Sequence, residues 1–127
     1  MTVRSEVTDF IKKKTSNLDL VSRIDDKLVH LSFGHTTIDM PAEEVKPFSD
    51  FMGETKKELI DLRSEEASIM PLAEKKTDNY EFSSWKDCEV VYLSIGHTMI
   101  TISHDEFTAV CDFIKETSNK LIQCRPR

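Results

Sequence analysis

The stretch LSFGHT at residues 31–36 recurs as LSIGHT at residues 93–98. Extended outward at the same offset of 62, the match covers residues 13–60 and 75–122 without a gap, and 20 of the 48 aligned pairs are identical. Only two copies are present, and their period is longer than that of the common solenoid repeats. The sequence therefore predicts a duplicated unit whose two copies, repeat one (13–60) and repeat two (75–122), pack into a single domain, 1–127.

Each copy shows the alternation of a half-buried antiparallel meander. Apolar residues alternate with other residues in 17–23, where Leu18 and Leu20 share a face, and in 28–33. The same pattern returns in 79–85, where Tyr80 and Phe82 share a face, and in 90–95. A Gly-His turn at 34–35, matched at 96–97, leads into a third strand, because glycine accepts a positive φ at little cost.

A helix follows the third strand in both copies. Ser103 and Glu106 have the spacing of a capping box, and Pro41 stands at the equivalent helix start in the first copy. The predicted fold class is α+β, with two tandem βββα repeats that form one pseudo-twofold domain. We also predict an extra N-terminal amphipathic helix over residues 4–14 and a connector over 61–74.

Composition limits the classes of partner. The formal net charge is −6, which repels phosphate backbones unless a local basic patch offsets it. No apolar run reaches the roughly 18 residues of a membrane helix, so we expect no membrane partner. Three cysteines without a CxxC pair fit a reducing compartment, which favours the cytoplasm.

Residues that could carry chemistry do not form a recognisable motif. His35 and His97 occupy equivalent turns and could approach each other in a metal or anion site, although a histidine next to glycine more often simply sets the turn. Cys111 lies two helical turns from His104, too far for a thiolate–imidazole pair. We therefore predict no catalytic residues, no metal site and no cofactor, and we expect that the protein is not an enzyme.

The sheet face opposite the predicted helices is the most informative surface. Alternation places a mixture of aromatic, aliphatic and polar side chains on it, and this face is either open or covered by the rest of the chain. In the second copy Trp85, Tyr92 and Met99 stand where the first copy has Arg23, His30 and Thr37. Trp and Tyr are typical anchors of protein interfaces. The predicted partner-binding residues are Trp85, Tyr92, Met99, Val90, Arg23 and His30.

A meander followed by a helix, duplicated within one chain, resembles the PUR repeat family and the single-stranded-DNA-binding transcriptional coactivator family. The closest stretches are residues 99–107, similar to the last strand and polar helix cap of those families, and residues 48–52, similar to their Phe-x-Asp helix. The resemblance implies a sheet face that binds single strands and four strands per unit. This chain departs from it in two ways, because alternation supports only three strands unless 12–16 and 74–78 form another, and because Arg23 is the only cation on the predicted face.

We therefore expect a non-enzymatic interaction or regulatory module that binds a protein partner, or a second copy of itself, through its sheet face. The alternative is a single-stranded nucleic-acid-binding protein that uses the same face. A small enzyme or metal-binding protein is the third hypothesis.

Overall fold

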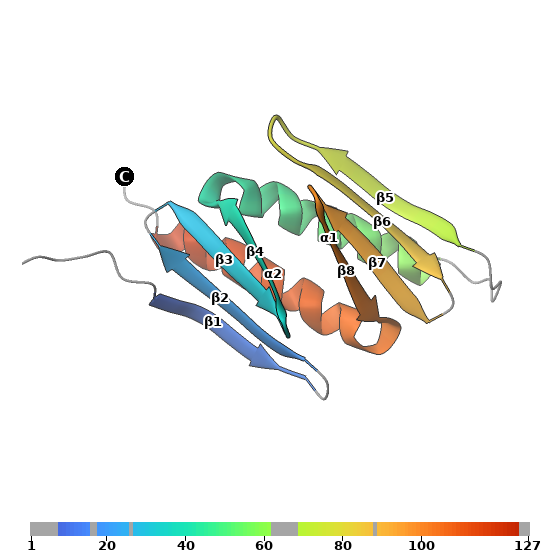
Figure 1. The fold of residues 1–127 in the computed structure, drawn as a ribbon, viewed down its shortest axis with the longest axis horizontal. Helices are drawn as coiled ribbons and strands as arrows, with labels where there is room; N and C mark the ends of the chain where they lie inside the picture. The colour runs from blue at the N-terminus through green and yellow to red at the C-terminus, as the bar shows by residue number, and fades with distance from the viewer. Residues whose placement is uncertain (1–7, 16–17, 26, 62–68, 88, 125–127) are drawn as a thin grey trace, which may run out of the picture.

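The computed structural model describes residues 8–15, 18–25, 27–61, 69–87 and 89–124, which form an α+β fold with two four-stranded antiparallel sheets and two helices. Sheet A consists of β1 (Thr8–Lys14), β2 (Asp19–Asp25), β3 (Leu28–Phe33) and β4 (Thr36–Pro41), and α1 (Ala42–Asp61) follows it. Sheet B consists of β5 (Met70–Lys76), β6 (Glu81–Asp87), β7 (Val90–Ile95) and β8 (Thr98–Ser103), and α2 (His104–Cys124) follows it. Figure 1 shows both helices behind the two sheets.

The two sheets have the same strand order and the same register. Leu20 lies opposite Phe33 in sheet A, and Phe82 lies opposite Ile95 in sheet B, again at an offset of 62. Gly34 and Gly96 have φ values of 67° and 62°, a left-handed conformation that glycine adopts without strain. The predicted Gly-His turns are therefore confirmed, and they fix which residues of the flanking strands face the core.

The predicted N-terminal helix is wrong over the residues that can be compared. Thr8–Lys14 is strand β1, which pairs with β2, whereas residues 4–7 lie outside the described part of the chain. Three successive lysines hide the alternation of this strand. The side chains of Ile11 and Lys13 are half-buried, and Lys13 Nζ lies 3.2 Å from Glu116 Oε2 on α2. The long aliphatic stem of a lysine lets it occupy such an inward position.

The connector predicted over 61–74 also contains a strand. Pairing of β5 with β6 begins at Met70 and includes a shift in register between Pro71 and Ala73. Proline is tolerated there because β5 is an edge strand with an irregularity. Each copy therefore has four strands before its helix, one more than the three predicted.

Each helix packs against both sheets and so joins the two copies. α1 contacts β5 and β6 of the other copy as well as β3 and β4 of its own, and α2 contacts β1 and β2 of the other copy as well as β7 and β8 of its own. The ring of Phe82 on β6 stacks on those of Phe48 and Phe51 of α1, with centroids 5.4 Å away in both cases. Reciprocally, Phe113 of α2 meets Phe33 of β3 edge to face at 6.0 Å. The core is therefore built across the two copies.

Two buried pairs of hydroxyl groups also join a helix of one copy to a strand of the other. Thr55 of α1 and Ser84 of β6 are hydrogen-bonded at 2.7 Å, and Thr117 of α2 donates to Ser22 of β2 at 3.0 Å. The two pairs are equivalent at the offset of 62. All four side chains are almost completely buried, so their hydroxyls need partners within the protein, and Ser84 also donates to the carbonyl oxygen of Ala73 at 3.5 Å.

Polar contacts also join the first copy to the turn between β5 and β6. Glu44, which is buried in the first turn of α1, accepts hydrogen bonds from Thr77 Oγ1 at 2.8 Å and Asn79 Nδ2 at 3.1 Å. The Tyr80 hydroxyl donates to the carbonyl oxygen of Asp39 at 3.1 Å. Burial, together with the nearby carboxylates of Glu44 and Asp39, raises the pKa of Tyr80.

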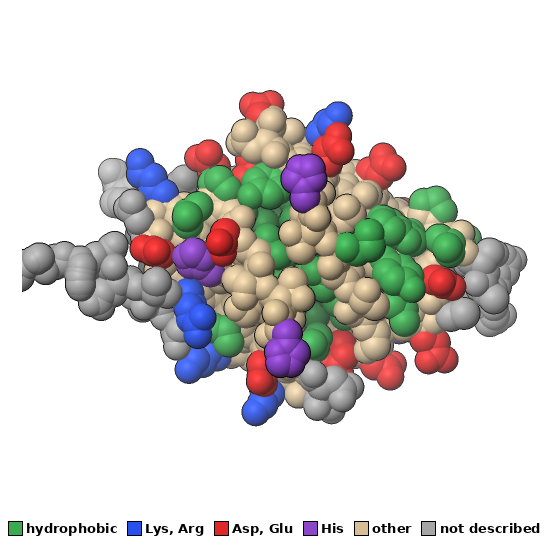
Figure 2. All heavy atoms as spheres, in the orientation of Figure 1, with side chains coloured by type: hydrophobic (Ala, Val, Ile, Leu, Met, Phe, Trp, Pro, Cys, Tyr) green, Lys and Arg blue, Asp and Glu red, His purple; other side chains and the backbone are tan. Residues whose placement is uncertain are grey.

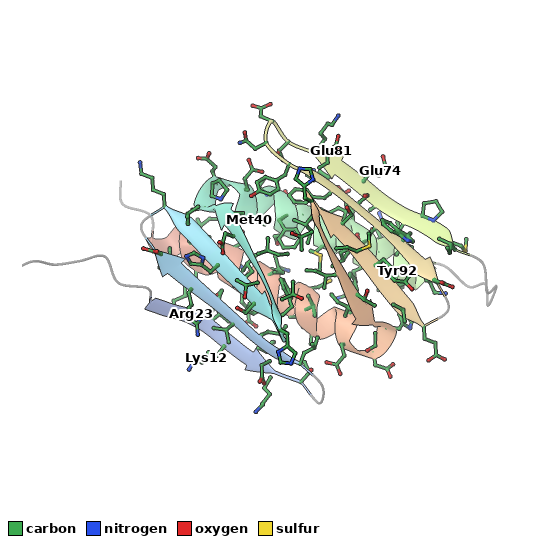
Figure 3. The ribbon with its side chains drawn as sticks, viewed as in Figure 1. Lys12, Arg23, Met40, Glu74, Glu81 and Tyr92 are labelled. Atoms are coloured by element: carbon green, nitrogen blue, oxygen red, sulfur yellow. The ribbon has the colours of Figure 1, made fainter. Side chains whose placement is uncertain are left out.

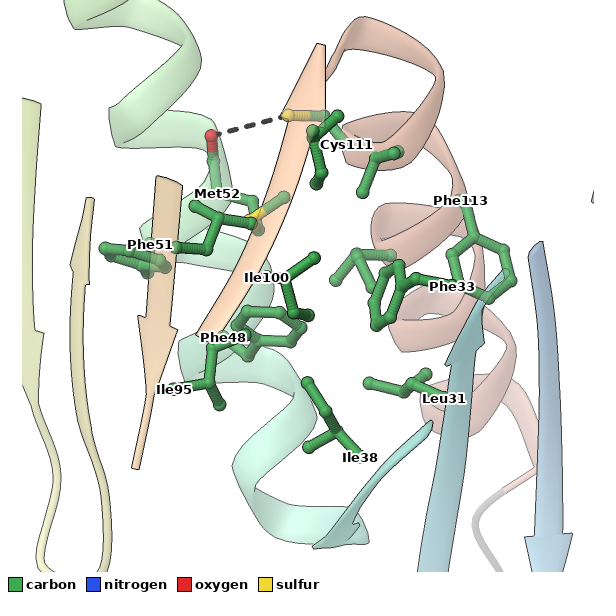
Figure 4. Packing of buried hydrophobic residues seen from close by; sticks show 14 of the residues in the cluster. Leu31, Phe33, Ile38, Phe48, Phe51, Met52, Ile95, Ile100, Cys111 and Phe113 are labelled. Carbon is green, nitrogen blue, oxygen red and sulfur yellow. Dashed lines mark hydrogen bonds between the residues drawn. The ribbon is translucent and has the colours of Figure 1, made fainter. Parts of the chain in front are cut away.

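One cluster of buried apolar side chains includes residues of both sheets and both helices (Figure 4). Cys111 of α2 lies in this cluster, and its thiol donates to the carbonyl oxygen of Met52 of α1 at 3.6 Å. No helix among the described residues is both long and apolar enough to cross a membrane.

Cys111 should resist alkylation in the folded protein. Burial raises the pKa of its thiol from 9.0 to about 12, against a smaller opposing effect of Lys56. The thiolate fraction at pH 8 is therefore lower by about a thousandfold, and the thiolate is the reactive form. Iodoacetamide labelling followed by peptide mass mapping should show Cys111 modified in urea but not in buffer. Equal labelling in both conditions would contradict this placement.

The same pKa shift predicts how stability changes with pH. The folded state retains the Cys111 proton to a higher pH than the unfolded state does, because its pKa is raised. This contribution to stability is complete below about pH 9 and is lost progressively as the pH rises toward 12. A Cys111→Ser variant should lack that part of the alkaline decline in unfolding free energy.

Candidate interaction surface

The face of both sheets that points away from the helices carries the residues singled out from the sequence. We call it the outer face. On sheet B it presents Trp85, Val90, Tyr92 and Met99, none of which is buried in the core. No described helix or strand lies over this face, which Figure 2 shows from the front. Within the described chain the outer face is therefore open.

Trp85 and Tyr92 form the centre of this surface. They lie directly opposite each other on β6 and β7, and their rings stack with centroids 6.0 Å apart and planes inclined by 26°. Pro71 of β5 lies opposite Trp85 on the other side, and Met99 of β8, which is 55% exposed, lies in the next row of the sheet. The aromatic patch is defined here by these residues together with their neighbour on β7: Pro71, Trp85, Val90, Tyr92 and Met99.

The equivalent part of sheet A is mostly polar, with the exception of Leu28, which stands in the place of Val90 and is exposed. Arg23 and His30 lie opposite each other, and His30 lies opposite Asp39 on β4. The Nδ1 atom of His30 is 2.6 Å from Asp39 Oδ1, and its Nε2 atom is 3.8 Å from Asp25 Oδ2. Figure 2 shows the contrast between the two sheets, with apolar side chains gathered over sheet B and charged ones over sheet A.

The structure thus separates the six predicted partner-binding residues into two groups. Trp85, Val90 and Tyr92 lie together on sheet B, with Met99 beside them, whereas Arg23 and His30 lie together on sheet A. Pro71 was not predicted because it falls in the supposed connector. The contact between His30 and Asp39 was also missed, although the two-residue turn at 34–35 makes these residues opposite partners once the hairpin register is written out.

The repeated histidines do not form a metal centre among the described residues. His35 and His97 are both exposed in their turns, and no group of three or more His, Cys, Asp or Glu side chains in the described ranges is placed to hold a metal ion. In both turns the glycine supplies the positive φ that the turn requires.

The opposite side of the molecule has a shallow groove of about 550 Å³ along the two helices. Several lysines line it, but acids accompany them: Lys46 Nζ lies 3.0 Å from Asp50 Oδ1, and Lys75 Nζ lies 4.0 Å from Glu54 Oε2. This groove is lined by charged and polar side chains and a glycine, and no aromatic or aliphatic side chain lines it.

Comparison with known proteins assigns no family to the chain. No protein-family model matches it, and no curated protein matches it.

Proposed function

We propose that the protein is a non-enzymatic interaction module that binds a protein partner through the aromatic patch on sheet B. The observation that carries this proposal is the stacked pair of Trp85 and Tyr92 on an uncovered sheet face. Two large aromatic side chains supply much contact area for little loss of conformational freedom, and such residues dominate the binding energy of many interfaces.

The comparison between the copies supports the same proposal. At equivalent positions of the outer face, Trp85, Tyr92 and Met99 replace Arg23, His30 and Thr37. A face that meets only water gains nothing from such replacements, because exposed apolar groups are poorly solvated. We further propose that the two ββββα copies act as one pseudo-twofold domain, in which sheet A supports the fold and sheet B supplies the binding surface.

The test is the double variant Trp85→Ser, Tyr92→Ser, used as an immobilised bait beside the wild type. Both side chains are directed away from the core, so the variant should remain folded by circular dichroism while it loses the proteins, or the second copy, that the wild type retains. Arg23→Ser, His30→Ser is the matched control at the equivalent positions of sheet A, and it should retain them.

Two results would contradict the proposal. If the Trp85→Ser, Tyr92→Ser variant is unfolded, the face belongs to the internal packing of the protein. If it is folded and retains the same partners, the interaction site lies elsewhere.

Single-stranded nucleic-acid binding is the second candidate function. The four strands in each unit are the number that the resemblance to the PUR repeat and coactivator families implies, and stacked aromatic rings on an open sheet can receive bases. If this function holds, Trp85→Ala should cost about 1–3 kcal/mol of binding free energy, and affinity should fall steeply with salt. We expect weak binding of an oligothymidylate at physiological salt, because acids surround the patch.

A further inference from the structure

We infer that the occupant of the aromatic patch is a basic protein segment, one that carries lysine or arginine side chains together with apolar side chains. This inference rests on the proposed function and adds the chemical class of the partner. It is based on the charges around the patch and on how they differ from those around the equivalent part of sheet A.

The border of the aromatic patch is acidic. By register, Glu74, Glu81 and Asp87 share the outer face of sheet B with the patch, and Glu89 lies in the adjoining turn. Lys76 is the one lysine or arginine that the described strands place on this face. Its Nζ atom lies 3.1 Å from Glu81 Oε2. The remaining acids face solvent next to an apolar surface.

This charge pattern is only partly shared with the first copy, where Asp19 and Asp25 are the acidic equivalents of Glu81 and Asp87. The equivalents of Glu74 and Glu89 are Lys12 and Lys27, and the equivalent of Trp85 is Arg23. Where the first copy has three cations, the second copy thus has two acids and an aromatic ring. Figure 3 shows Lys12 and Arg23 over sheet A and Glu74 and Glu81 over sheet B.

A basic segment with apolar side chains complements both the apolar patch and its acidic border. Its apolar side chains can cover Val90 and Met99, and its cations can pair with the acids or lie over the face of Trp85, a favourable cation–π arrangement. The border charges also attract a cationic partner from a distance and raise its association rate.

The same charges disfavour the other two occupants. A phosphate backbone would approach the acidic border of a chain whose net charge is −6. A second copy would bring either another acidic sheet B or a sheet A face whose cations are accompanied by acids such as Asp25 and Asp39. Neither is a complement for this border.

The experiment uses the single tryptophan of the chain as its reporter. Trp85 is the only tryptophan, so its fluorescence reports occupancy of the patch directly. The probe is a 12-residue peptide of three Lys-Lys-Val-Val repeats, which presents both residue types on each face of an extended chain. Its controls are the same peptide with glutamate in place of lysine and one with serine in place of valine. We expect the emission of Trp85 to change on titration with the first peptide and not with the controls.

Charge-reversal variants then locate the site. The double variant Glu74→Lys, Asp87→Lys should weaken binding of the lysine–valine peptide by at least about tenfold. Glu58→Lys, Asp112→Lys changes the net charge equally at exposed positions of the helices, away from the outer face, and should weaken binding by less than about threefold. Equal losses in both variants would overturn the inference, because net charge alone would then explain the binding.

The other occupants give different results in the same assay. A change in Trp85 emission on dilution of the protein alone would show that a second copy occupies the patch; it would overturn the basic-segment inference while leaving the proposed interaction function intact. A response to an oligothymidylate but not to the lysine–valine peptide would overturn both. No response to the basic peptide, with partner capture by the wild type still dependent on Trp85 and Tyr92, would overturn only the inference.

Discussion

Replacing Phe82 with alanine is expected to lower the free energy of unfolding by about 3–5 kcal/mol, a typical loss for a buried phenylalanine. The Phe82 side chain is 1% exposed and stacks on Phe48 and Phe51 of α1, so its removal leaves a cavity between sheet B and the helix of the other copy. Packed cores relax only partly around such a cavity. Urea unfolding followed by circular dichroism measures the loss.

A surface substitution provides the control for Phe82→Ala. Ile122→Ala on α2 also removes apolar atoms, but Ile122 is 53% exposed, and its substitution should change the unfolding free energy by less than about 0.5 kcal/mol. Equal effects of the two substitutions would show that Phe82 does not join α1 to sheet B.

Neither half of the chain is expected to fold as a monomer when it is produced alone. In residues 1–61, sheet A lacks α2, so Phe33 has no Phe113 to contact and Ser22 has no Thr117. In residues 69–127, Phe82 and Ser84 lose their partners on α1 in the same way. A half of this size also buries too little surface to offset its conformational entropy.

Mixing the two separately produced halves tests the same expectation. The two halves should assemble into a complex with the circular dichroism spectrum of the intact chain, and sedimentation should show one copy of each. A cooperative thermal transition in either half, at a sedimentation coefficient that corresponds to a monomer, would contradict the packing of each helix against the sheet of the other copy.

The repeat made most of the fold predictable, because each element could be inferred twice. The strands at 28–33 and 90–95 have the predicted bounds, and Leu31 and Leu93 point inward as the alternation indicates. Strands β1 and β5 were missed for local reasons. Three lysines mask the pattern of the first, and Pro71 and a shift in register interrupt that of the second.

The packing of each helix against the sheet of the other copy could not be predicted from periodicity. Phe48 and Phe51 show that α1 has an apolar face, but hydrophobic spacing does not say which sheet that face covers. The choice depends on contacts between residues far apart in the chain, such as Thr55 with Ser84. Such pairings depend on the three-dimensional path of the whole chain, which a local pattern does not encode.

The candidate surface was partly predictable for the same reasons. Alternation placed Trp85, Tyr92, Val90 and Met99 on the outer face, and the structure puts them there. The alternation did not place Pro71 on this face, because strand β5 was not expected. The acidic border follows from the register of β5 with β6, which places Glu74 beside Ser83 and toward the aromatic patch.

The buried hydroxyl pairs make a substitution in one copy costly unless the other copy changes with it. A substitution at Ser22 that removes its hydroxyl leaves Thr117 without a partner, at a cost of about 1–3 kcal/mol, and Ser84 constrains Thr55 in the same way. Among descendants of the same ancestor, residues 22 and 117 should therefore change together, as should residues 55 and 84. Among the described residues, no buried hydrogen bond of this kind ties positions 85 and 92 to the other copy, so substitutions there are free of this constraint.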